Sequence, residues 1–267
     1  MPNSDNTPTR ATALITGASS GIGYELTKVF ARHGHDLVLV ARNQDKLYQL
    51  AEELRATFGL TVKVLAKDLS LPTTVPEIVA ELQQTAIRVG LLVNNAGVDV
   101  YGYFYDTAWT QELQMIQLNL VSLTYLTKYL LADMRQQGFG RILNLGSTGS
   151  FVPSPLNTVY SATKAYVWSF SVALAEELRG TGITVTVLCP GATRTEFQGR
   201  AHIEGVRLLR YGVMEAASVA EAGYRGMMAG QRVVVPGLYN QVQVLLARLL
   251  PSSLMVRMAK AMLRPMS

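Results

Sequence analysis

The sequence has very few of the residues that metal centres and disulfide frameworks require. Its 267 residues include one cysteine, Cys189, and three histidines, His33, His35 and His202. A single cysteine excludes an intramolecular disulfide, which is typical of a reducing compartment. The histidines show no metal-ligand spacing with Cys189 or with clustered acidic residues, so we expect no metal site.

Long apolar runs are also missing. No stretch approaches the roughly 18 consecutive apolar residues that a transmembrane helix needs. Residues 1–10 are polar, contain Pro2 and Pro8 and lack the apolar segment of a secretory signal peptide. We interpret them as a short disordered arm. These absences predict a cytoplasmic protein.

Acidic residues are absent from the end of the chain. The last is Glu221, so residues 222–267 carry a charge of +6, against −1 for the rest. These cations are sparse and stand among Leu, Met and Val, unlike the dense basic stripe of a nucleic-acid-binding protein, so we expect no nucleic-acid partner. We interpret residues 239–267 as an apolar and basic helical extension that caps the core or packs on another subunit. The alternative is peripheral contact with an anionic membrane or with an acidic carrier-borne substrate.

The rest of the chain alternates regularly between strand and helix patterns. Near-continuous apolar runs, typical of strands buried on both faces, lie at 11–16, 36–41, 61–66, 90–94, 140–146, 183–188 and 232–235. Segments with helical periodicity lie at 21–33, 43–58, 75–86, 110–136, 158–179 and 216–229. This alternation predicts one α/β domain over residues 11–238. We expect a doubly wound parallel sheet of about seven strands between two layers of helices, the Rossmann-type fold.

The first predicted strand runs into a glycine-rich turn. The sequence Thr-Gly-Ala-Ser-Ser-Gly-Ile-Gly has the spacing Gly-x3-Gly-x-Gly, and a helix pattern follows it. A helix N-terminus offers free N–H groups and partial positive charge to a dinucleotide pyrophosphate, while glycines permit the tight turn and the close approach. Glycines at such a turn can serve turn geometry alone, so the flanking strand and helix strengthen the interpretation. The residues expected to contact the dinucleotide here are Gly17, Ser19, Ser20, Gly21, Ile22 and Gly23.

The end of the second predicted strand indicates which dinucleotide is bound. NAD-selective folds place a carboxylate on the adenosine ribose at this point, but this chain has Ala41 followed by Arg42. A guanidinium can bind a 2′-phosphate through two hydrogen bonds, so we expect NADP(H) in preference to NAD(H). Arg42 could instead be a solvated surface charge.

Tyr160 and Lys164 form the candidate catalytic pair. Residues four apart on a helix share a face. A nearby ammonium favours the phenolate form of a tyrosine, which brings its pKa from about 10 towards the working pH. A lone Tyr/Lys pair on a helix is otherwise an ordinary packing arrangement.

These segments together resemble the classical single-domain form of the short-chain dehydrogenase/reductase family. The resemblance rests on the glycine motif at 16–23, Asn-Asn-Ala-Gly at 94–97, Tyr-Ser-Ala-Thr-Lys at 160–164 and Pro190-Gly191, in the family's order. It covers residues 11–200 and thins afterwards. The resemblance implies a homodimer or homotetramer assembled through the helices at 110–136 and 158–179.

The resemblance also implies the roles of individual residues. Tyr160 would be the acid or base at the substrate oxygen, Lys164 would lower its pKa and hold the nicotinamide ribose, Ser147 would donate to the substrate oxygen, and Asn119 would position a water. Asp68 would bind the adenine, although a loop aspartate at a helix start has the same pattern, and Asn95 could be structural alone. Further cofactor contacts would come from Leu69, Asn95, Ala96, Gly97, Pro190, Gly191, Thr193 and Thr195.

The function predicted is hydride transfer between NADP(H) and the carbonyl or secondary alcohol of a largely apolar substrate. A lining of Tyr101, Tyr103, Phe151, Val152, Leu156 and Phe197 would suit such a substrate, beneath a lid at 192–212. One alternative is a catalytically silent NADP(H)-binding sensor or scaffold, which the intact Asn119, Ser147, Tyr160 and Lys164 disfavour. An epimerase or dehydratase is another, but those relatives have a different glycine spacing and a longer C-terminal substrate domain.

Overall fold

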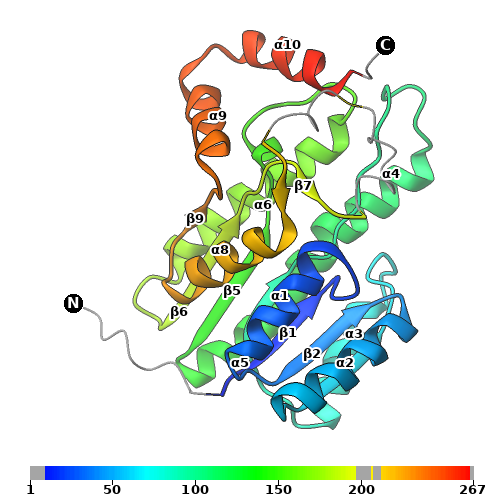
Figure 1. The fold of residues 1–267 in the computed structure, drawn as a ribbon, viewed down its shortest axis with the longest axis vertical. Helices are drawn as coiled ribbons and strands as arrows, with labels where there is room; N and C mark the ends of the chain where they lie inside the picture. The colour runs from blue at the N-terminus through cyan, green and yellow to red at the C-terminus, as the bar shows by residue number, and fades with distance from the viewer. Residues whose placement is uncertain (1–9, 197–205, 207–211, 265–267) are drawn as a thin grey trace.

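A seven-stranded sheet forms the centre of the molecule (Figure 1). The computed structural model describes residues 10–196, 206 and 212–264. All strand pairs are parallel, in the order β3-β2-β1-β4-β5-β6-β9. The predicted doubly wound sheet is therefore confirmed. Its strands are β1 (Thr12–Thr16), β2 (Leu37–Ala41), β3 (Val62–Ala66), β4 (Val89–Asn94), β5 (Gly140–Leu145), β6 (Ile183–Leu188) and β9 (Val233–Val234).

Helices cover both faces of this sheet and form two apolar cores with it. One core contains side chains of α1 (Gly21–Arg32), α2 (Gln44–Phe58) and α8 (Ala216–Met228). The other contains side chains of α3 (Thr74–Gln84) and α5 (Leu123–Gln137), with α6 (Thr158–Glu177) packed against it. Every residue of β2 is buried, which explains why its sequence shows no polar alternation.

Local signals set the helix ends. Asn43 precedes α2, and its side chain accepts a hydrogen bond of 2.9 Å from the Lys46 amide, which satisfies one of the free donors of the first turn. Gly59 ends the same helix in the left-handed conformation, with φ of 63°. These signals place the predicted helix at 43–58 within one residue of its observed bounds.

The helix predicted at 110–136 is not one regular α-helix. It consists of α4 (Trp109–Ile116), a π-helical segment η1 (Gln117–Ser122) and α5. The wider π turn accommodates an extra residue and changes which side chains face inward, and such turns occur frequently at functional sites. Asn119 lies in this segment and is buried.

Two further helices follow the sheet, α9 (Leu238–Leu249) and α10 (Ser252–Leu263), separated by Pro251. Figure 1 shows both beyond the carboxyl ends of the strands. Tyr101, on the loop after β4, donates its hydroxyl hydrogen to the Leu263 carbonyl at the end of α10. Among the described residues, no helix has the length and apolarity to cross a bilayer.

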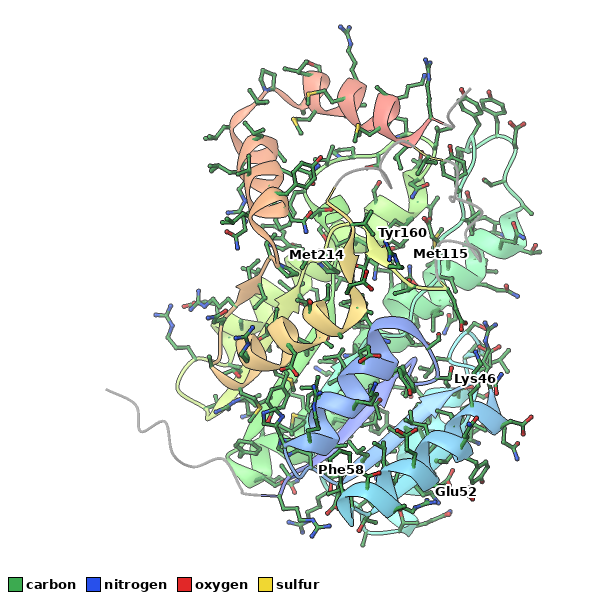
Figure 2. All side chains as sticks on the ribbon, viewed as in Figure 1. Lys46, Glu52, Phe58, Met115, Tyr160 and Met214 are labelled. Atoms are coloured by element: carbon green, nitrogen blue, oxygen red, sulfur yellow. The ribbon has the colours of Figure 1, made fainter. Side chains whose placement is uncertain are left out.

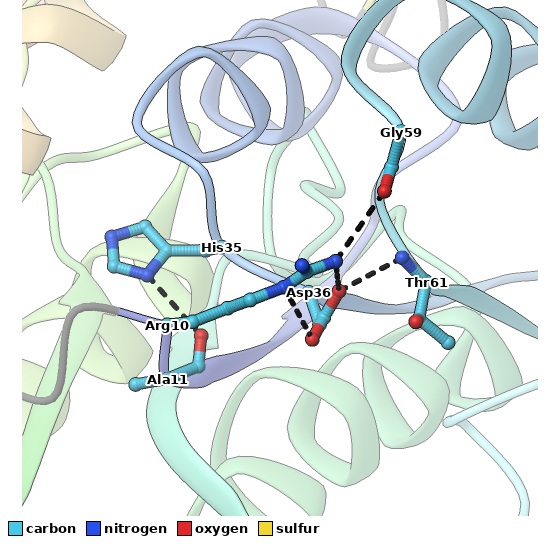
Figure 3. Close-up of polar contacts among 6 residues, drawn as sticks. All are labelled: Arg10, Ala11, His35, Asp36, Gly59 and Thr61. Carbon is cyan, nitrogen blue, oxygen red and sulfur yellow. Dashed lines mark hydrogen bonds and ion pairs between the residues drawn. The ribbon is translucent and has the colours of Figure 1, made fainter.

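A polar cluster ties the start of β1 to the neighbouring strands (Figure 3). Arg10, which we had placed in the disordered arm, donates from two guanidinium nitrogens to Asp36, at 2.9 and 3.1 Å. Asp36 also accepts a 2.8 Å hydrogen bond from the Thr61 amide before β3. Partial burial raises the pKa of Asp36, but the Arg10 and Thr61 donors lower it by more, so the carboxyl stays ionised.

We predict that Asp36→Ala destabilises the fold more than Arg10→Ala does. Removing Asp36 takes away both the ion pair with Arg10 and the acceptor of the Thr61 amide, whereas removing Arg10 takes away the ion pair and leaves the Thr61 hydrogen bond in place. The ion pair is exposed to water, so its loss alone should destabilise the fold only slightly. Urea unfolding of both variants measures the difference, and equal losses would contradict the assigned role of Asp36.

Candidate active site

A cavity of about 730 Å³ lies at the carboxyl edge of the sheet. The strand order reverses between β1 and β4, and such a switch point is where open α/β sheets bind ligands. Most residues expected from the sequence line this one cavity. They are Gly17, Ser19, Ser20, Gly21, Ile22, Arg42, Asp68, Leu69, Asn95, Ala96, Gly97, Ser147, Tyr160, Lys164, Pro190, Gly191, Thr193 and Thr195.

Hydrogen bonds to the segment after β4 hold the start of the glycine turn in place. The Asn95 amide group donates to the Thr16 carbonyl at 2.9 Å, and the Thr16 hydroxyl accepts the backbone N–H groups of Asn95 and Ala96, both at 3.0 Å. Gly17 has φ of 67°, and a Cβ there would lie 2.7 Å from the Asn95 side chain. Asn95 therefore has the structural role considered from the sequence, and it also lines the cavity.

Gly23 differs from its predicted role as a cofactor contact, because it does not line the cavity. It lies behind the turn, where a Cβ would lie 2.2 Å from the Gly17 carbonyl oxygen and 2.3 Å from the Asn95 side chain. Position 23 therefore requires glycine, because α1 packs closely against the turn at this point. A larger residue at this position would displace the turn itself.

The segment after β6 closes the opposite side of the turn. A Cβ on Gly21 would lie 3.1 Å from the Thr195 side chain. Thr193 and Thr195 belong to the described part of the region 192–212, where a lid was expected; 197–205 and 207–211, which include Phe197 and His202, lie outside the described residues. Thr195 thus lies directly beside the glycine turn, and both line the cavity.

Three cations line the cavity near β2 and β3. Arg42 follows β2 and is exposed, Lys46 lies on α2, and Lys67 follows β3. Lys46 bonds Glu196 at 3.1 Å and Lys67 bonds Glu77 at 2.7 Å. Sequence reasoning identified Arg42 alone, because the contributions of Lys46 and Lys67 depend on how α2 and β3 meet at this edge.

Asp68 lines this end of the cavity and also shapes its own loop. One of its carboxylate oxygens accepts hydrogen bonds from the Ser70 amide at 2.9 Å and the Ser70 hydroxyl at 2.7 Å. The Asp68 carbonyl accepts from Thr74, in the first turn of α3. Both alternatives considered for Asp68, a ligand contact and a loop residue at a helix start, agree with this position.

Tyr160, Lys164 and Ser147 meet at the other end of the cavity. Tyr160 lies below α9 and α10 in Figure 2. The Ser147 side chain hydrogen-bonds that of Tyr160 and also accepts from the Gly149 amide at 3.0 Å. The Lys164 ammonium lies 5.7 Å from the centre of the Tyr160 ring and donates to the Leu145 carbonyl at 2.8 Å.

Asn119 lies directly behind this group and does not line the cavity. Its carbonyl oxygen accepts the Val98 amide at 3.0 Å, and its amide donates to the Val98 carbonyl at 2.9 Å and to Thr163 at 3.2 Å. A Cβ on Gly97 would lie 3.2 Å from the Asn119 carbonyl oxygen and 3.6 Å from the Lys164 nitrogen. The π turn therefore places Asn119 where it fixes the loop after β4 close to Lys164.

The expected lowering of the tyrosine pKa is not observed in this structure. Burial, followed by the negative charge of Asp99, raises the pKa of Tyr160, and the Ser147 hydrogen bond offsets only part of the rise. Burial lowers the pKa of Lys164 to about 8. The attraction between Tyr160 and Lys164, on which the expected lowering rests, does not offset the cost of desolvating both groups.

Asp99 and Asn157 form a polar pair in the cavity that sequence reasoning missed. The Asn157 amide donates to one Asp99 carboxylate oxygen at 2.8 Å, and both side chains are buried. Burial raises the pKa of Asp99 to about 7, against the opposing effects of the Asn157 and Val100 amides and of the Lys164 charge. The residue follows the Asn-Asn-Ala-Gly segment by two positions, and nothing in its local sequence indicates that it is buried.

The C-terminal helices also line the cavity. Side chains of α9 and α10 cover its outer part, and they are Gln243, Val244, Leu246, Ala247, Met255, Met258, Ala259, Met262 and Leu263. The methionines at 255, 258 and 262 share one helix face, a spacing that could have indicated an adaptable apolar lining.

Several aromatic residues expected in the lining lie elsewhere, although Val152 does line the cavity. Phe151 packs on Trp168, and the Arg248 guanidinium of α9 lies 5.2 Å above its ring. Tyr103 is exposed and stacks on Tyr105. Leu156 and Tyr101 are also outside the lining, and the Tyr101 hydroxyl donates to the Leu263 carbonyl of α10.

The described residues of the cavity fit a dinucleotide in shape and chemistry. One end carries cations, the middle is the glycine turn with a bare backbone at Gly17 and Gly21, and the other end carries Tyr160 and Lys164. Side chains at those glycines would occupy the space beside the turn. Among the described residues, no three His, Cys, Asp or Glu side chains gather as a metal site would require. Cys189 is buried, and burial raises the pKa of its thiol to about 12.

We predict that Asp99→Asn removes a pH-dependent loss of stability. The pKa of Asp99 rises from 3.8 to about 7 on folding. The unfolded chain therefore releases this proton first as pH rises, and the wild type loses on the order of 4 kcal/mol between about pH 4 and pH 7. Urea unfolding from pH 5 to pH 8 should show the variant gaining stability relative to the wild type. A difference independent of pH would contradict the raised pKa.

The chain matches the family model described as short chain dehydrogenase over residues 11–204. It is 36% identical to mouse 17-beta-hydroxysteroid dehydrogenase type 3 over 186 residues, which are 68% of this chain and 60% of that protein. The chain thus spans about three fifths of the length of that curated relative.

Solved structures are similar over more of the chain. A short-chain dehydrogenase from Sphingobium yanoikuyae in complex with NADPH is 40% identical, with a TM-score of 0.80, over 86% of this chain and 89% of that one. The bulky-bulky ketone specific alcohol dehydrogenase from Comamonas testosteroni is 32% identical, with a TM-score of 0.77, over 91% and 93%.

Proposed function

Because the chain belongs to the short-chain dehydrogenase family, we propose that it transfers a hydride between NADP(H) and a carbonyl or secondary alcohol of a largely apolar substrate. The observation that carries this proposal is the arrangement of Tyr160, Lys164 and Ser147 at one end of a cavity whose other end is the glycine turn and Arg42. A dinucleotide bound along the cavity would place its nicotinamide beside the Tyr160 hydroxyl group, which would transfer the proton.

In this proposal each side chain has a separate role at the substrate. A reduced nicotinamide bound here would supply the hydride, a proton together with two electrons, for the carbonyl carbon. Tyr160 donates its hydroxyl proton to the carbonyl oxygen, and Ser147 stabilises the negative charge that develops there. Lys164 and Asn119 hold the tyrosine and the loop after β4 in position. Oxidation of an alcohol reverses these transfers.

The electrostatics of the site favour the reduction direction. Burial raises the pKa of Tyr160, so its hydroxyl is protonated near neutral pH and can act as an acid. Alcohol oxidation needs the phenolate, which the buried site and the Asp99 charge disfavour. For Tyr160 to act as a base, a positive charge would have to stabilise its phenolate. The oxidised nicotinamide ring or protonated Lys164 would supply that charge.

The preference for NADP(H) rests on the cations near β2. Ala41 offers no carboxylate at the position that would bind the adenosine ribose hydroxyls, and Arg42, Lys46 and Lys67 line the cavity next to it. A 2′-phosphate would be attracted most strongly by Arg42, because Glu196 and Glu77 partly neutralise Lys46 and Lys67. The NADPH complex of the Sphingobium yanoikuyae relative supports the same choice.

An apolar substrate is proposed from the outer part of the cavity. Val152 and the apolar side chains of α9 and α10 surround the space beyond Tyr160. Relatives that act on steroids, very-long-chain 3-oxoacyl-CoA and bulky ketones support a large hydrophobic substrate.

We propose a homo-oligomer from the family resemblance, and a cytoplasmic location from the single cysteine and the lack of long apolar runs in the sequence. Tyr125, Tyr129 and Tyr166 are exposed on α5 and α6 and would be covered in a homodimer or homotetramer formed through these helices. Light scattering during gel filtration measures the mass of that assembly. The exposed Leu249 and the basic Arg257 of the last helices fit the alternative of peripheral membrane contact. Cell fractionation separates this alternative from the cytoplasmic location.

Tyr160→Phe tests the proposed chemistry. With NADPH and a panel of steroid, aryl and acyl ketones, we predict that the variant lowers kcat/KM by about 100-fold or more, since the proton donor is gone. NADPH binding, followed by its fluorescence, should be retained. Tyr48→Phe, at an exposed position on α2, is the matched control.

Turnover that survives in Tyr160→Phe would show that another group supplies the proton. Tight NADPH binding by the wild type without turnover of any ketone would instead support the sensor alternative.

Arg42→Ala tests cofactor selection. Loss of the guanidinium should raise the KM for NADPH by about 10- to 100-fold, as expected for a charged hydrogen bond to phosphate, and leave the KM for NADH unchanged. Arg135→Ala, an exposed position on α5, controls for net charge. Equal effects on both cofactors would mean that Arg42 does not contact the 2′-phosphate.

A further inference from the structure

Helix α9 exposes an apolar stripe on the side away from the cavity. Four apolar side chains recur at intervals of four, three and four residues, so they share one helix face. They are Leu238, Val242, Leu245 and Leu249, which are 80%, 54%, 55% and 71% exposed. The buried Asn240 and Val244 lie on the opposite face of the helix. Soluble proteins rarely leave a continuous apolar surface of this kind in water, so we expect a partner to cover it.

Helix α10 carries basic side chains on its own outer side. Its methionines line the cavity, whereas Arg257, Lys260 and Arg264 follow one another at intervals of three and four residues on the other side. Arg257 and Arg264 are exposed, and none of the ion pairs between described residues involves any of the three. The sequence has no acidic residue after Glu221, so nothing within the last two helices offsets this charge.

Exposed aromatic side chains stand beside the end of α10. The loop between β4 and α4, with the first residue of α4, exposes Tyr103, Phe104, Tyr105 and Trp109. The hydrogen bond from Tyr101 to the Leu263 carbonyl joins this loop to the end of α10. Figure 1 shows the loop before α4 and α10 at the same end of the molecule. Asp106 is the one acidic residue of 101–109, against three cations on α10.

Together these features have the chemistry of a surface that binds an anionic membrane. Apolar side chains enter the boundary between headgroups and acyl chains, while Lys and Arg attract the anionic headgroups. Trp and Tyr are enriched at the same depth, because each has an apolar ring and a polar group that stays hydrated. The stripe on α9, the cations of α10 and the aromatic loop supply one feature each.

A second copy of the chain fits this surface less well. Two copies that met through the same face would bring their sets of α10 cations together. Because residues 222–267 contain no acidic residue, neither copy could neutralise the charges of the other through these helices. An anionic bilayer supplies the negative charge that is missing.

We propose that α9, α10 and the loop before α4 dock this protein on the surface of an anionic membrane. The docking goes beyond the proposed function and does not depend on it. The inner sides of the same helices line the cavity, so docking would bring the outer part of the cavity next to the bilayer, where apolar molecules dissolve. Contact through a partly inserted surface is reversible and is compatible with a pool of the protein in the cytoplasm.

Sedimentation with vesicles tests the requirement for charge. The full chain would be mixed with vesicles of phosphatidylcholine alone or of equal parts phosphatidylcholine and phosphatidylglycerol. The wild type should bind the anionic vesicles about 10-fold or more tightly than the neutral ones, and added salt should weaken this binding. Arg257→Gln combined with Arg264→Gln should weaken it about 20-fold, since each cation at the surface contributes about fivefold.

The matched control removes two arginines from the opposite edge of the sheet. Arg88 precedes β4 and Arg135 lies near the end of α5, and both are exposed. Arg88→Gln combined with Arg135→Gln changes the net charge equally and should leave vesicle binding within about twofold of the wild type.

A second pair of variants tests the apolar stripe. Leu245→Ser combined with Leu249→Ser should weaken binding to anionic vesicles about 10-fold or more, because less apolar surface enters the bilayer. Both side chains are exposed and neither lines the cavity, so the fold and the affinity for NADPH should be retained. Light scattering should give this variant the same mass as the wild type.

Three results would overturn the proposal. They are no binding of the wild type to anionic vesicles, equal binding to neutral and anionic vesicles, and equal binding by the wild type and the arginine variant of α10. Absence of vesicle binding together with a lower mass for the leucine variant would assign the stripe to a contact between copies. Ketone reduction in solution tests the proposed function separately, because none of the substituted residues lines the cavity.

Discussion

One buried threonine holds together the two strands between which the sheet reverses its order. The Thr16 hydroxyl accepts the backbone N–H groups of Asn95 and Ala96 and donates to the Val93 carbonyl at 3.2 Å. The glycine turn after β1 and the segment after β4 are thereby fixed to each other. Because all the paired strands of the large sheet are parallel, the loops after β2, β5 and β6 open at the same edge. The cations, the glycine turn and the Tyr160 group lie in one cavity as a consequence.

Burial then decides the chemistry of that cavity. Lys164 and Asp99 are buried and Tyr160 is half-buried, and burial shifts each pKa in the direction that favours the neutral form. A protonated phenol, a lysine with a pKa of about 8 and a carboxyl with a pKa of about 7 suit proton donation to a carbonyl oxygen at neutral pH. The helices α9 and α10 contribute to this burial, since they cover the outer part of the cavity.

The sequence predicted the sheet, its order of elements and most residues of the cavity. Those predictions succeeded because apolar runs, glycine spacing and the Tyr-x3-Lys pair are local signals whose structural consequences are nearly fixed. It did not predict the π turn at Asn119, the burial of Asp99 or the closeness of the last two helices to the cavity. Each of these depends on contacts between segments far apart in the chain, such as Asp99 with Asn157 and Tyr101 with Leu263. The raised pKa of Tyr160 was missed for the same reason, because desolvation depends on the whole surrounding structure.

Isotope transfer from the cofactor tests the central claim most directly. The protein would be incubated with NADPH deuterated at C4 of the nicotinamide, on either face, and with a bulky aryl ketone, and the alcohol product analysed by mass spectrometry. The account predicts an alcohol that carries one deuterium on its carbinol carbon, from one of the two labelled faces only. Absence of alcohol, or an alcohol without deuterium from both labelled cofactors, would contradict hydride transfer by this site.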